Sequence, residues 1–219
     1  MSVYRFKKVA VLGAGVMGAQ IAAHLANAGV PVILFDLPAD GTDKNAIVNK
    51  ALANLGKLSP APLASKALAG TIRAGNYDEH LQLLSQCDLI IEAIAERLDW
   101  KKSLYARILP FVAGHAVLAS NTSGLSINAL SEVLDESLHH RFCGLHFFNP
   151  PRYMHLVELM PCASADTEVL TALETFLVST LGKGVVYAKD TPNFIGNRIG
   201  VFSILSILHH TEQFKMGFD

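Results

Sequence analysis

A histidine and a glutamate stand in two short apolar segments of this sequence. His146 lies in residues 142–147 and Glu158 lies in residues 156–160, and the Asn-Pro-Pro sequence at 149–151 favours a turn between them. An imidazole exchanges protons near neutral pH, and a carboxylate can fix its tautomer and stabilise its protonated form. We therefore predict two strands that carry a proton-transfer site. The alternative interpretation is a core histidine bonded to a backbone carbonyl, with a glutamate at a strand end.

A glycine-rich loop close to the N-terminus predicts a dinucleotide-binding site. The segment 8–12 has the composition of a buried strand and is followed at once by Gly-Ala-Gly-Val-Met-Gly and a helix predicted over residues 19–28. In such a loop the first glycine permits a tight turn, the second lets a pyrophosphate approach the backbone, and the third lets helix and strand pack closely. The phosphates are then expected on the free N–H groups at the positive end of the helix dipole. The loop residues predicted to contact the cofactor are Gly13, Gly15, Val16, Met17 and Gly18.

An aspartate completes this arrangement and identifies the cofactor. A second apolar strand, predicted over residues 32–35, ends on Asp36, at the usual spacing of about 20 residues from the glycine loop. A carboxylate at this position accepts hydrogen bonds from the hydroxyls of the adenosine ribose, and it repels the 2′-phosphate of NADP. NAD is therefore the predicted cofactor, with FAD as the alternative.

Two charged residues follow the next buried strand, which is predicted over residues 87–94. Ligands of open parallel sheets bind where the strands end, so Glu96 is predicted to contact the cofactor. Lys101 lies in the first turn of an amphipathic helix predicted over residues 98–112. From there it either reaches back toward the cofactor or is solvated.

A run of hydroxyls and an amide follows another short strand, predicted over residues 116–119. The run is Ser-Asn-Thr-Ser-Gly at 120–124, and its donors, Ser123 among them, suit a carbonyl or hydroxyl ligand. The alternative is a polar turn ahead of a helix predicted over residues 127–134, with Ser126 as its N-cap. The residues alone leave both interpretations open.

The composition predicts a globular chain with no nucleic-acid partner and no membrane span. Of the 219 residues, 51% are hydrophobic and 17% are charged, which is enough for a sizeable core. The formal net charge of −1 provides no basic face, and no apolar segment is long enough to cross a bilayer. Cys87, Cys143 and Cys162 lie in or beside apolar runs, which predicts reduced core thiols and a cytoplasmic protein. No spacing of ligand residues indicates a metal site.

A long insertion, residues 37–80, follows Asp36 where a crossover helix is expected. Residues 43–58 carry apolar side chains on one helical face, and a proline-rich turn precedes a short helix predicted over residues 63–69. We expect a helical hairpin that stands off the sheet. Its lysines suit an arm that contacts an anionic, extended substrate carrier, and a solvated helix face is the alternative.

The last segment of the chain predicts the start of a second domain. Residues 1–188 are assigned to an α/β domain of the Rossmann type, doubly wound with a mostly parallel sheet, and residues 189–219 to a helical domain. A helix that opens at Pro192 carries apolar residues around nearly its whole circumference, which predicts burial. Because no later element covers it, we expect the first helix of a truncated all-α domain.

In combination, these motifs resemble the L-3-hydroxyacyl-CoA dehydrogenases of fatty-acid β-oxidation over essentially the whole chain. The matching segments are Gly-Ala-Gly-Val-Met-Gly at 13–18, Ser-Asn-Thr-Ser at 120–123, His-Phe-Phe-Asn-Pro at 146–150, Leu-Val-Glu at 156–158, Lys-Asp-Thr-Pro at 189–192 and Phe-Ile-Gly-Asn-Arg at 194–198. The variants at 149–153 and 189–194 look most like the dehydrogenase part of bacterial multifunctional β-oxidation proteins. Such proteins continue into a helical second domain and often carry an enoyl-CoA hydratase region.

The resemblance implies NAD-dependent interconversion of L-3-hydroxyacyl-CoA and 3-ketoacyl-CoA. His146 would be the general acid/base and Glu158 its support. Ser123 and Asn197 would complete the catalytic group and contact the substrate. The resemblance also implies a homodimer through the helical C-terminal region. The other implied contacts are Asn149 to the substrate, and Asp36, Glu96, Lys101 and Ser123 to NAD.

Two positions depart from the family pattern. Many relatives carry glycine where this chain has Asn193. A serine that contacts CoA in some relatives aligns with Ala51, which leaves Lys57 as the predicted substitute contact. The second departure keeps open an NAD-dependent dehydrogenase of a free hydroxy acid or sugar acid. A non-catalytic, structural NAD-binding protein is the remaining alternative.

Overall fold

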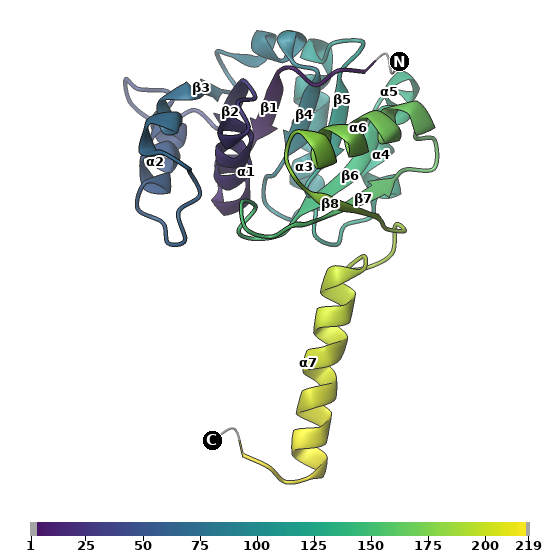
Figure 1. Ribbon diagram of the computed structural model, residues 1–219. Helices are drawn as coiled ribbons and strands as arrows, with labels where there is room; N and C mark the ends of the chain where they lie inside the picture. The colour runs from purple at the N-terminus through teal and green to yellow at the C-terminus, as the bar shows by residue number, and fades with distance from the viewer. Residues whose placement is uncertain (1–3, 218–219) are drawn as a thin grey trace.

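Eight strands form one sheet within residues 4–217, the part of the chain that this computed structural model describes (Figure 1). Their order is β3-β2-β1-β4-β5-β6-β7-β8, and only β6 and β7 among these neighbours are antiparallel. The predicted doubly wound, mostly parallel sheet is therefore confirmed. The outer ends of the two predicted domains, residues 1–3 and 218–219, lie outside the described residues. The strands are β1 (Val9–Leu12), β2 (Val32–Asp36), β3 (Ile72–Asn76), β4 (Leu89–Glu92), β5 (Val117–Ser120), β6 (Phe142–Phe147), β7 (Leu156–Pro161) and β8 (Gly184–Tyr187).

Helices cover both faces of the sheet. The α-helices are α1 (Val16–Asn27), α2 (Ala46–Leu55), α3 (Leu98–Ile108), α4 (Ile127–Ser131), α5 (Glu136–His139), α6 (Thr167–Ser179) and α7 (Gly196–Gln213). Apolar side chains of α1, α2 and α6 fill one core, and those of α3, α4 and α5 fill the other. Successive residues of β1 alternate between them, with Val9 and Val11 in the first core and Ala10 and Leu12 in the second. This alternation makes β1 apolar throughout, as expected for a strand buried on both faces.

The carboxyl ends of four neighbouring parallel strands meet at one edge of the sheet. These strands are β1, β4, β5 and β6. The chain runs outward from β1 to β2 and β3, and then returns to place β4 on the other side of β1. Such a reversal opens a crevice at the strand ends, where ligands of doubly wound sheets bind.

The insertion at residues 37–80 differs from the predicted free-standing hairpin. Val48 and Leu55 of α2 are buried in the core with α1, so α2 packs on the domain. The return helix is a 3₁₀ helix, η1 (Lys66–Thr71), and it leads into the unpredicted strand β3, which pairs in parallel with β2. Two further 3₁₀ helices are η2 (Leu81–Gln86) and η3 (Leu109–Phe111). The strand escaped prediction because its sequence, Ile-Arg-Ala-Gly-Asn, contains one large apolar residue and no alternation.

The C-terminal helix begins later than predicted. Residues 191–194 form a turn, and α7 starts at Gly196 instead of Pro192. Asn193 and Phe194 have φ angles of 63° and 47°, in the left-handed region that a right-handed helix excludes. Asparagine tolerates this conformation better than most residues, so Asn193 preserves a turn that glycine in relatives would also allow.

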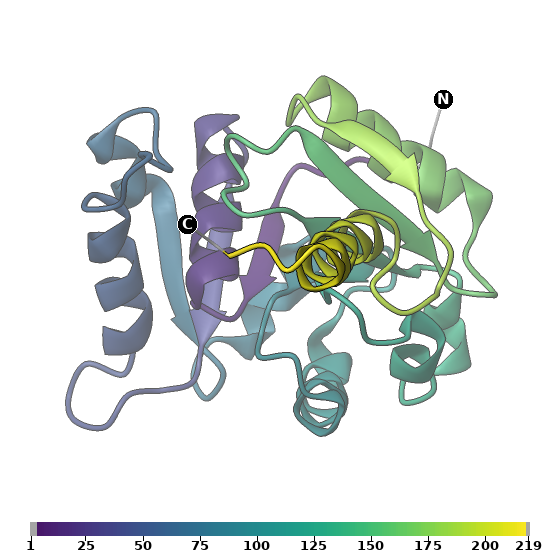
Figure 2. The ribbon, with the colours of Figure 1, turned by 90° about the horizontal axis from the view of Figure 1, so that it is seen from below.

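Helix α7 extends away from the sheet (Figure 1) and is viewed nearly end-on in Figure 2. None of its residues is buried, and the exposed fraction of Phe202 reaches 71%. No element of residues 4–217 covers the helix, so its predicted burial, which requires a covering domain, stays a prediction. Its apolar circumference remains as a large exposed surface.

Two smaller expectations concern the cysteines and membrane spans. All three cysteines are free and buried, as predicted. Burial raises the pKa of the Cys87 thiol to about 11 and that of Cys143 to about 12, which keeps both protonated at neutral pH. Among residues 4–217, no helix has the length and apolar composition needed to cross a membrane.

Candidate active site

Strand pairing brings His146 and Glu158 directly opposite each other. The antiparallel register of β6 and β7 matches the two residues, and His146 Nδ1 lies 2.7 Å from Glu158 Oε2. His146 is 5% exposed, and Glu158 has no exposed surface. A carboxylate only accepts hydrogen bonds, so Nδ1 carries the ring proton. Nε2 then has a free lone pair, and it makes no hydrogen bond with any described residue. The pair offers a basic nitrogen at the edge of the sheet.

Two aromatic rings enclose this imidazole. The ring centroid of Phe148 lies 4.5 Å from that of His146, and the centroid of Phe194 lies 6.1 Å away. Phe148 follows β6, whereas Phe194 belongs to the turn before α7. The rings restrict the orientation of the imidazole and lower the local polarity, which strengthens its interaction with the carboxylate.

The second oxygen of Glu158 binds the start of α7. Oε1 accepts hydrogen bonds from the backbone N–H groups of Ile195 at 2.9 Å and Gly196 at 2.8 Å. Such N–H groups at a helix start have no partner within the helix. This contact was not predicted, because it depends on α7 beginning at Gly196.

Ser123 and Asn197 come together beside this pair. Ser123 lies three residues beyond the end of β5, and its carbonyl oxygen accepts a hydrogen bond of 3.3 Å from Asn197 Nδ2 in α7. Asn121 fixes the same strand end, because its Oδ1 accepts a 2.9 Å hydrogen bond from the N–H of Phe147, next to His146. The polar run after β5 therefore contacts both β6, next to His146, and the first turn of α7.

The two interpretations of this polar run apply to different residues. Thr122 and Ser126 make the turn: Thr122 Oγ1 accepts from Leu125 N at 2.9 Å, and Ser126 Oγ accepts from Ala129 N at 3.1 Å as the N-cap of α4. Ser123 takes no part in these turn contacts, and its side chain is exposed. Its hydroxyl therefore remains able to contact a ligand.

Glu96, which is predicted to contact the cofactor, faces the polar run in the structure. Its Oε1 accepts hydrogen bonds from Thr122 Oγ1 at 2.5 Å and from Ser123 N at 2.8 Å, with Ser123 Oγ at 3.2 Å. Partial burial raises the pKa of Glu96, but the Thr122 hydroxyl, the charge of Lys101 and the Ser123 donors lower it by more. The net direction is downward, so Glu96 is an ionised acceptor beside Ser123.

Lys101 differs from its predicted contact with NAD. The side chain has no exposed surface, and Nζ lies 2.6 Å from Glu92 Oε1 and 3.6 Å from Glu96 Oε2. Glu92 Oε2 accepts two further hydrogen bonds, from Tyr105 at 2.9 Å and from Ser120 at 2.7 Å. Because Lys101 has no accessible atoms, it does not reach a bound dinucleotide. Its charge attracts the carboxylate of Glu96 instead. This network was not predicted from the sequence, because Glu92 stands within an apolar strand.

The glycine loop has the geometry that a pyrophosphate requires. Gly13 has a φ of +103°, which a residue with a side chain rarely adopts. A Cβ atom added at Gly18 would lie 1.8 Å from the Gly13 carbonyl oxygen, so this glycine lets α1 approach β1. A Cβ added at Gly15 would meet no atom within 4 Å, so the backbone there is open to a ligand. The start of α1 has no side-chain cap, which leaves its N–H groups free.

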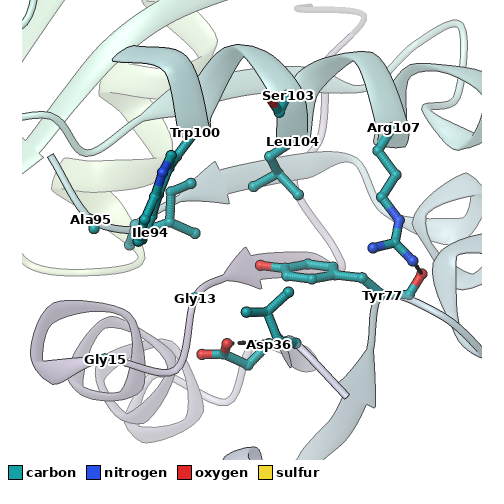
Figure 3. Close-up of a pocket in the computed structure, with 12 residues that line it drawn as sticks. Gly13, Gly15, Asp36, Tyr77, Ile94, Ala95, Trp100, Ser103, Leu104 and Arg107 are labelled. Carbon is teal, nitrogen blue, oxygen red and sulfur yellow. Dashed lines mark hydrogen bonds between the residues drawn. The ribbon is translucent and has the colours of Figure 1, made fainter. Parts of the chain in front are cut away.

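A cavity of about 500 Å³ adjoins this loop (Figure 3). Asp36 lies at its base, held by hydrogen bonds from Ala14 N to Oδ2 at 2.6 Å and from Leu37 N to Oδ1 at 2.7 Å. The ring of Tyr77 lies along the cavity floor, and its buried hydroxyl makes no hydrogen bond with a side chain of residues 4–217. A cavity of this size with a fixed carboxylate and a buried hydroxyl suits the adenosine half of NAD. The opposite wall comes from α3, through Trp100, Ser103, Leu104 and Arg107.

Asn149 and Lys57 occupy different positions relative to the site. Asn149 follows β6 and Phe148, and its Oδ1 accepts a 3.2 Å hydrogen bond from Gln20 Nε2 in α1, so it links the catalytic strand to the cofactor helix. Lys57 follows the C-terminal end of α2. Lys57 is exposed and precedes the loop at residues 61–63, where the Ala61 carbonyl oxygen accepts hydrogen bonds from Arg152 Nη1 at 2.7 Å and from the Tyr153 hydroxyl at 2.9 Å. Arg152 and Tyr153 lie between β6 and β7, and the contact of Lys57 with the substrate stays a prediction.

Comparison with known proteins gives a consistent result. The NAD binding domain of 3-hydroxyacyl-CoA dehydrogenases matches residues 8–191. A probable 3-hydroxyacyl-CoA dehydrogenase of Deinococcus radiodurans is 42% identical over 97% of this chain and 62% of that protein. A putative fatty acid oxidation complex trifunctional enzyme of Rickettsia felis is 43% identical over 97% of this chain and 30% of that protein. The crystal structure of M. tuberculosis FadB2 has a TM-score of 0.79 at 32% identity, covering 97% of this chain and 74% of that chain.

These matches define what the chain contains. It spans less than two thirds of the length of the two curated relatives, but the matched region includes the glycine loop, the polar run after β5 and the His146–Glu158 pair. The chain belongs to the 3-hydroxyacyl-CoA dehydrogenase family and contains the NAD-binding domain of that family.

Proposed function

We propose that this chain catalyses the NAD-dependent interconversion of L-3-hydroxyacyl-CoA and 3-ketoacyl-CoA in fatty-acid β-oxidation. The observation that carries the proposal is the buried His146–Glu158 pair, with its 2.7 Å hydrogen bond and its free Nε2. The pair lies at the same edge of the sheet as the glycine loop. Family membership then supports the choice of substrate over other hydroxy compounds.

In this reaction His146 moves one proton. Its neutral Nε2 would remove the proton of the 3-hydroxyl group, and NAD held at the glycine loop would supply the acceptor for the hydride of C3. Glu158 accepts the Nδ1–H and stabilises the imidazolium that forms. In the reverse direction, His146 returns the proton to the oxygen of the 3-keto group.

The neighbouring polar residues position the reactants. The hydroxyl of Ser123 and the amide of Asn197 hold the oxygen being oxidised, or the thioester carbonyl, so that C3 is correctly placed for hydride transfer. Asn149 borders the same space from the end of β6. Asp36 binds the adenosine ribose and Glu96 contacts NAD near Ser123, with Lys101 as the buried support of Glu96. Lys57 stays a predicted contact of the CoA moiety.

The proposal is tested by the rate of NADH oxidation with acetoacetyl-CoA compared with free acetoacetate. We expect kcat/KM at least about 100-fold higher for the thioester, because binding of the CoA moiety contributes to transition-state stabilisation. Equal values would identify a dehydrogenase of free acids. NAD binding without turnover of either compound would identify a non-catalytic protein. The same assay with His146→Gln measures the background rate.

We further infer that residues 189–219 begin a helical domain and that two copies of the chain associate through α7. The exposed apolar surface of this helix supports the inference, with exposed fractions of 71% for Phe202, 63% for Ile207 and 59% for Ile204. Sedimentation equilibrium should give a dimer that Phe202→Asp converts to monomer. A wild-type monomer at about 100 μM would contradict it. A cytoplasmic location and an attached enoyl-CoA hydratase region stay predictions.

A further inference from the structure

The start of α7 contacts the catalytic pair at a point that the proton-transfer scheme does not use. Glu158 divides its two oxygens between His146 and the backbone of Ile195 and Gly196. The carboxylate has no exposed surface, and the structure gives it no other side-chain partner among the described residues. Three donors therefore decide how the Glu158 carboxylate is oriented, and two of them belong to the helix.

Gly196 is closely packed at this point. A Cβ atom added there would lie 2.7 Å from Phe148 Cζ and 2.9 Å from Phe148 Cε1, distances that real Cβ atoms do not reach. The same atom would lie 3.7 Å from Glu158 Oε1. The distance to Glu158 is an ordinary van der Waals contact, so the clash is with the Phe148 ring, which lies 4.5 Å from the ring of His146. The absence of a side chain at 196 lets the helix start pack against Phe148 while its N–H groups reach the carboxylate.

The two N–H groups act on Glu158 in two ways. Their hydrogen bonds fix the rotation of the carboxylate, which keeps Oε2 directed at His146 Nδ1. The positive end of the helix dipole also attracts the negative charge of Oε1. A shift of α7 relative to the sheet changes both the direction and the strength with which Glu158 accepts the Nδ1–H.

We propose that the N-terminus of α7 is a positioning element of the active site, in which the N–H groups of Ile195 and Gly196 orient Glu158 and thereby set the tautomer and direction of His146. Gly196 and Phe148 act through this contact and do not touch the substrate. This inference deepens the proposed function and rests on it for its catalytic meaning.

Two glycine-to-alanine substitutions in the same helix provide the test. Gly196→Ala introduces the clash with Phe148, whereas a Cβ added at Gly200 meets no atom within 4 Å. Both substitutions increase helix propensity, so a difference between them does not arise from melting of α7. Gly200→Ala is therefore the matched control.

The first readout is the NMR signal of the His146 ring, which does not require turnover. The Nδ1 proton bonded to a buried carboxylate should give a low-field ¹H resonance with a ¹⁵N partner, assigned by its loss in His146→Gln. We expect Gly196→Ala to shift or remove this resonance and Gly200→Ala to leave it in place. With acetoacetyl-CoA, we expect Gly196→Ala to lower kcat by at least about tenfold while the Kd for NAD is unchanged.

A second substitution separates positioning from a general defect. Phe148→Leu removes the ring atoms that an alanine at 196 would strike, and it also removes the ring that packs on His146. The single variant Phe148→Leu is therefore the baseline, and adding Gly196→Ala to it should change the low-field resonance and kcat much less than Gly196→Ala changes them in the wild type. An unchanged resonance in Gly196→Ala would overturn the proposal, as would an equally large loss when Gly196→Ala is added to Phe148→Leu. If the wild-type chain shows the resonance but no turnover, the proposed function fails while the NMR comparison still decides the role of α7.

Discussion

Two carboxylates of this molecule, Glu92 and Glu158, are completely buried but have different partners. Glu92 pairs with the ammonium group of Lys101 and also accepts hydrogen bonds from Tyr105 and Ser120. In the described part of the chain, no lysine or arginine forms an ion pair with Glu158. Its partners are the ring of His146 and two backbone N–H groups of α7.

This difference indicates that Glu92 has a structural role, whereas Glu158 takes part in proton transfer. Burial of an ion costs several kcal/mol unless its charge is matched, and Lys101 matches Glu92 permanently. The proposed reaction takes no proton from that network. The partner of Glu158 becomes a cation only when the imidazole accepts a proton. The buried charge of Glu158 is therefore available to stabilise the imidazolium at the moment it forms.

The largest expected effect is the loss of the base itself. His146→Gln should lower kcat by roughly 10²–10⁴-fold, because glutamine keeps the approximate size but cannot accept the proton. The Kd for NAD, measured by calorimetry, should stay within about twofold, since His146 lies outside the cofactor cavity. His115→Gln is the control, because His115 is an exposed histidine paired with Asp88. Near-normal turnover in His146→Gln would remove the chemical role of this pair.

The structural role of Glu92 is tested by the free energy of unfolding. Lys101→Met leaves the charge of Glu92 buried without its partner, which should cost about 3–5 kcal/mol in the free energy of unfolding. The neighbouring Lys102 is partly exposed and lies 3.5 Å from Glu132, so Lys102→Met should cost at most about 1 kcal/mol. Urea denaturation measures both. Equal costs would show that Glu92 and Lys101 do not form the supporting pair described above.

Asp36 extends the comparison to a carboxylate at the cofactor cavity. Asp36→Ala should raise the Kd for NAD about tenfold or more, because hydrogen bonds to a charged acceptor are lost. The KM for acetoacetyl-CoA should change much less, since Asp36 lies at the adenosine end of the site. Titration with NAD and steady-state kinetics distinguish the two. Equal changes in both constants would argue against the ribose contact.

His24 is the counterpart of His146, a histidine without a carboxylate. Its Nε2 lies 3.0 Å from the Leu181 carbonyl oxygen, and its buried Nδ1 makes no hydrogen bond with any of residues 4–217. Burial, and then the charges of Lys183 and Arg152, lower the pKa of His24 to about 4. The unfolded chain therefore binds this proton more readily. Stability that is present above about pH 6.5 should be lost toward pH 4, by at most about 1.4 kcal/mol per pH unit.

Urea denaturation at pH 7, 5.5 and 4.5 tests this acid sensitivity. His24→Gln removes the titrating group, so its stability should decline less than that of the wild type over the same range. His115→Gln again serves as the control, because His115 is exposed. Parallel declines in all three proteins would show that His24 does not cause the loss.

The residues that could be predicted from sequence are those whose spacing is set by local backbone geometry. Gly13, Gly15, Gly18 and Asp36 belong to one strand–turn–helix–strand unit, so their relative positions follow from chain order. His146 and Glu158 stand at matching positions in two strands joined by a turn, which made their pairing predictable.

The features that were missed depend on contacts between distant segments. The environment of Lys101 is set by Glu92, which lies on a strand core that gave no sign of a buried charge pair. The edge strand β3 is specified by pairing with β2 more than by its own residues. The role of Gly196 follows from the turn at Asn193 and Phe194, whose backbone conformation no spacing rule predicts. Long-range packing, and not local propensity, decided each of these features.

A double-mutant cycle between His146 and Glu158 tests the central claim that Glu158 acts through His146. The measured quantity is kcat for acetoacetyl-CoA reduction in the wild type, Glu158→Gln, His146→Gln and the double variant. We predict that Glu158→Gln alone lowers kcat by about tenfold or more, and that the double variant is no more than about twofold slower than His146→Gln, because the pair works as one unit. Losses that multiply in the double variant would contradict the account.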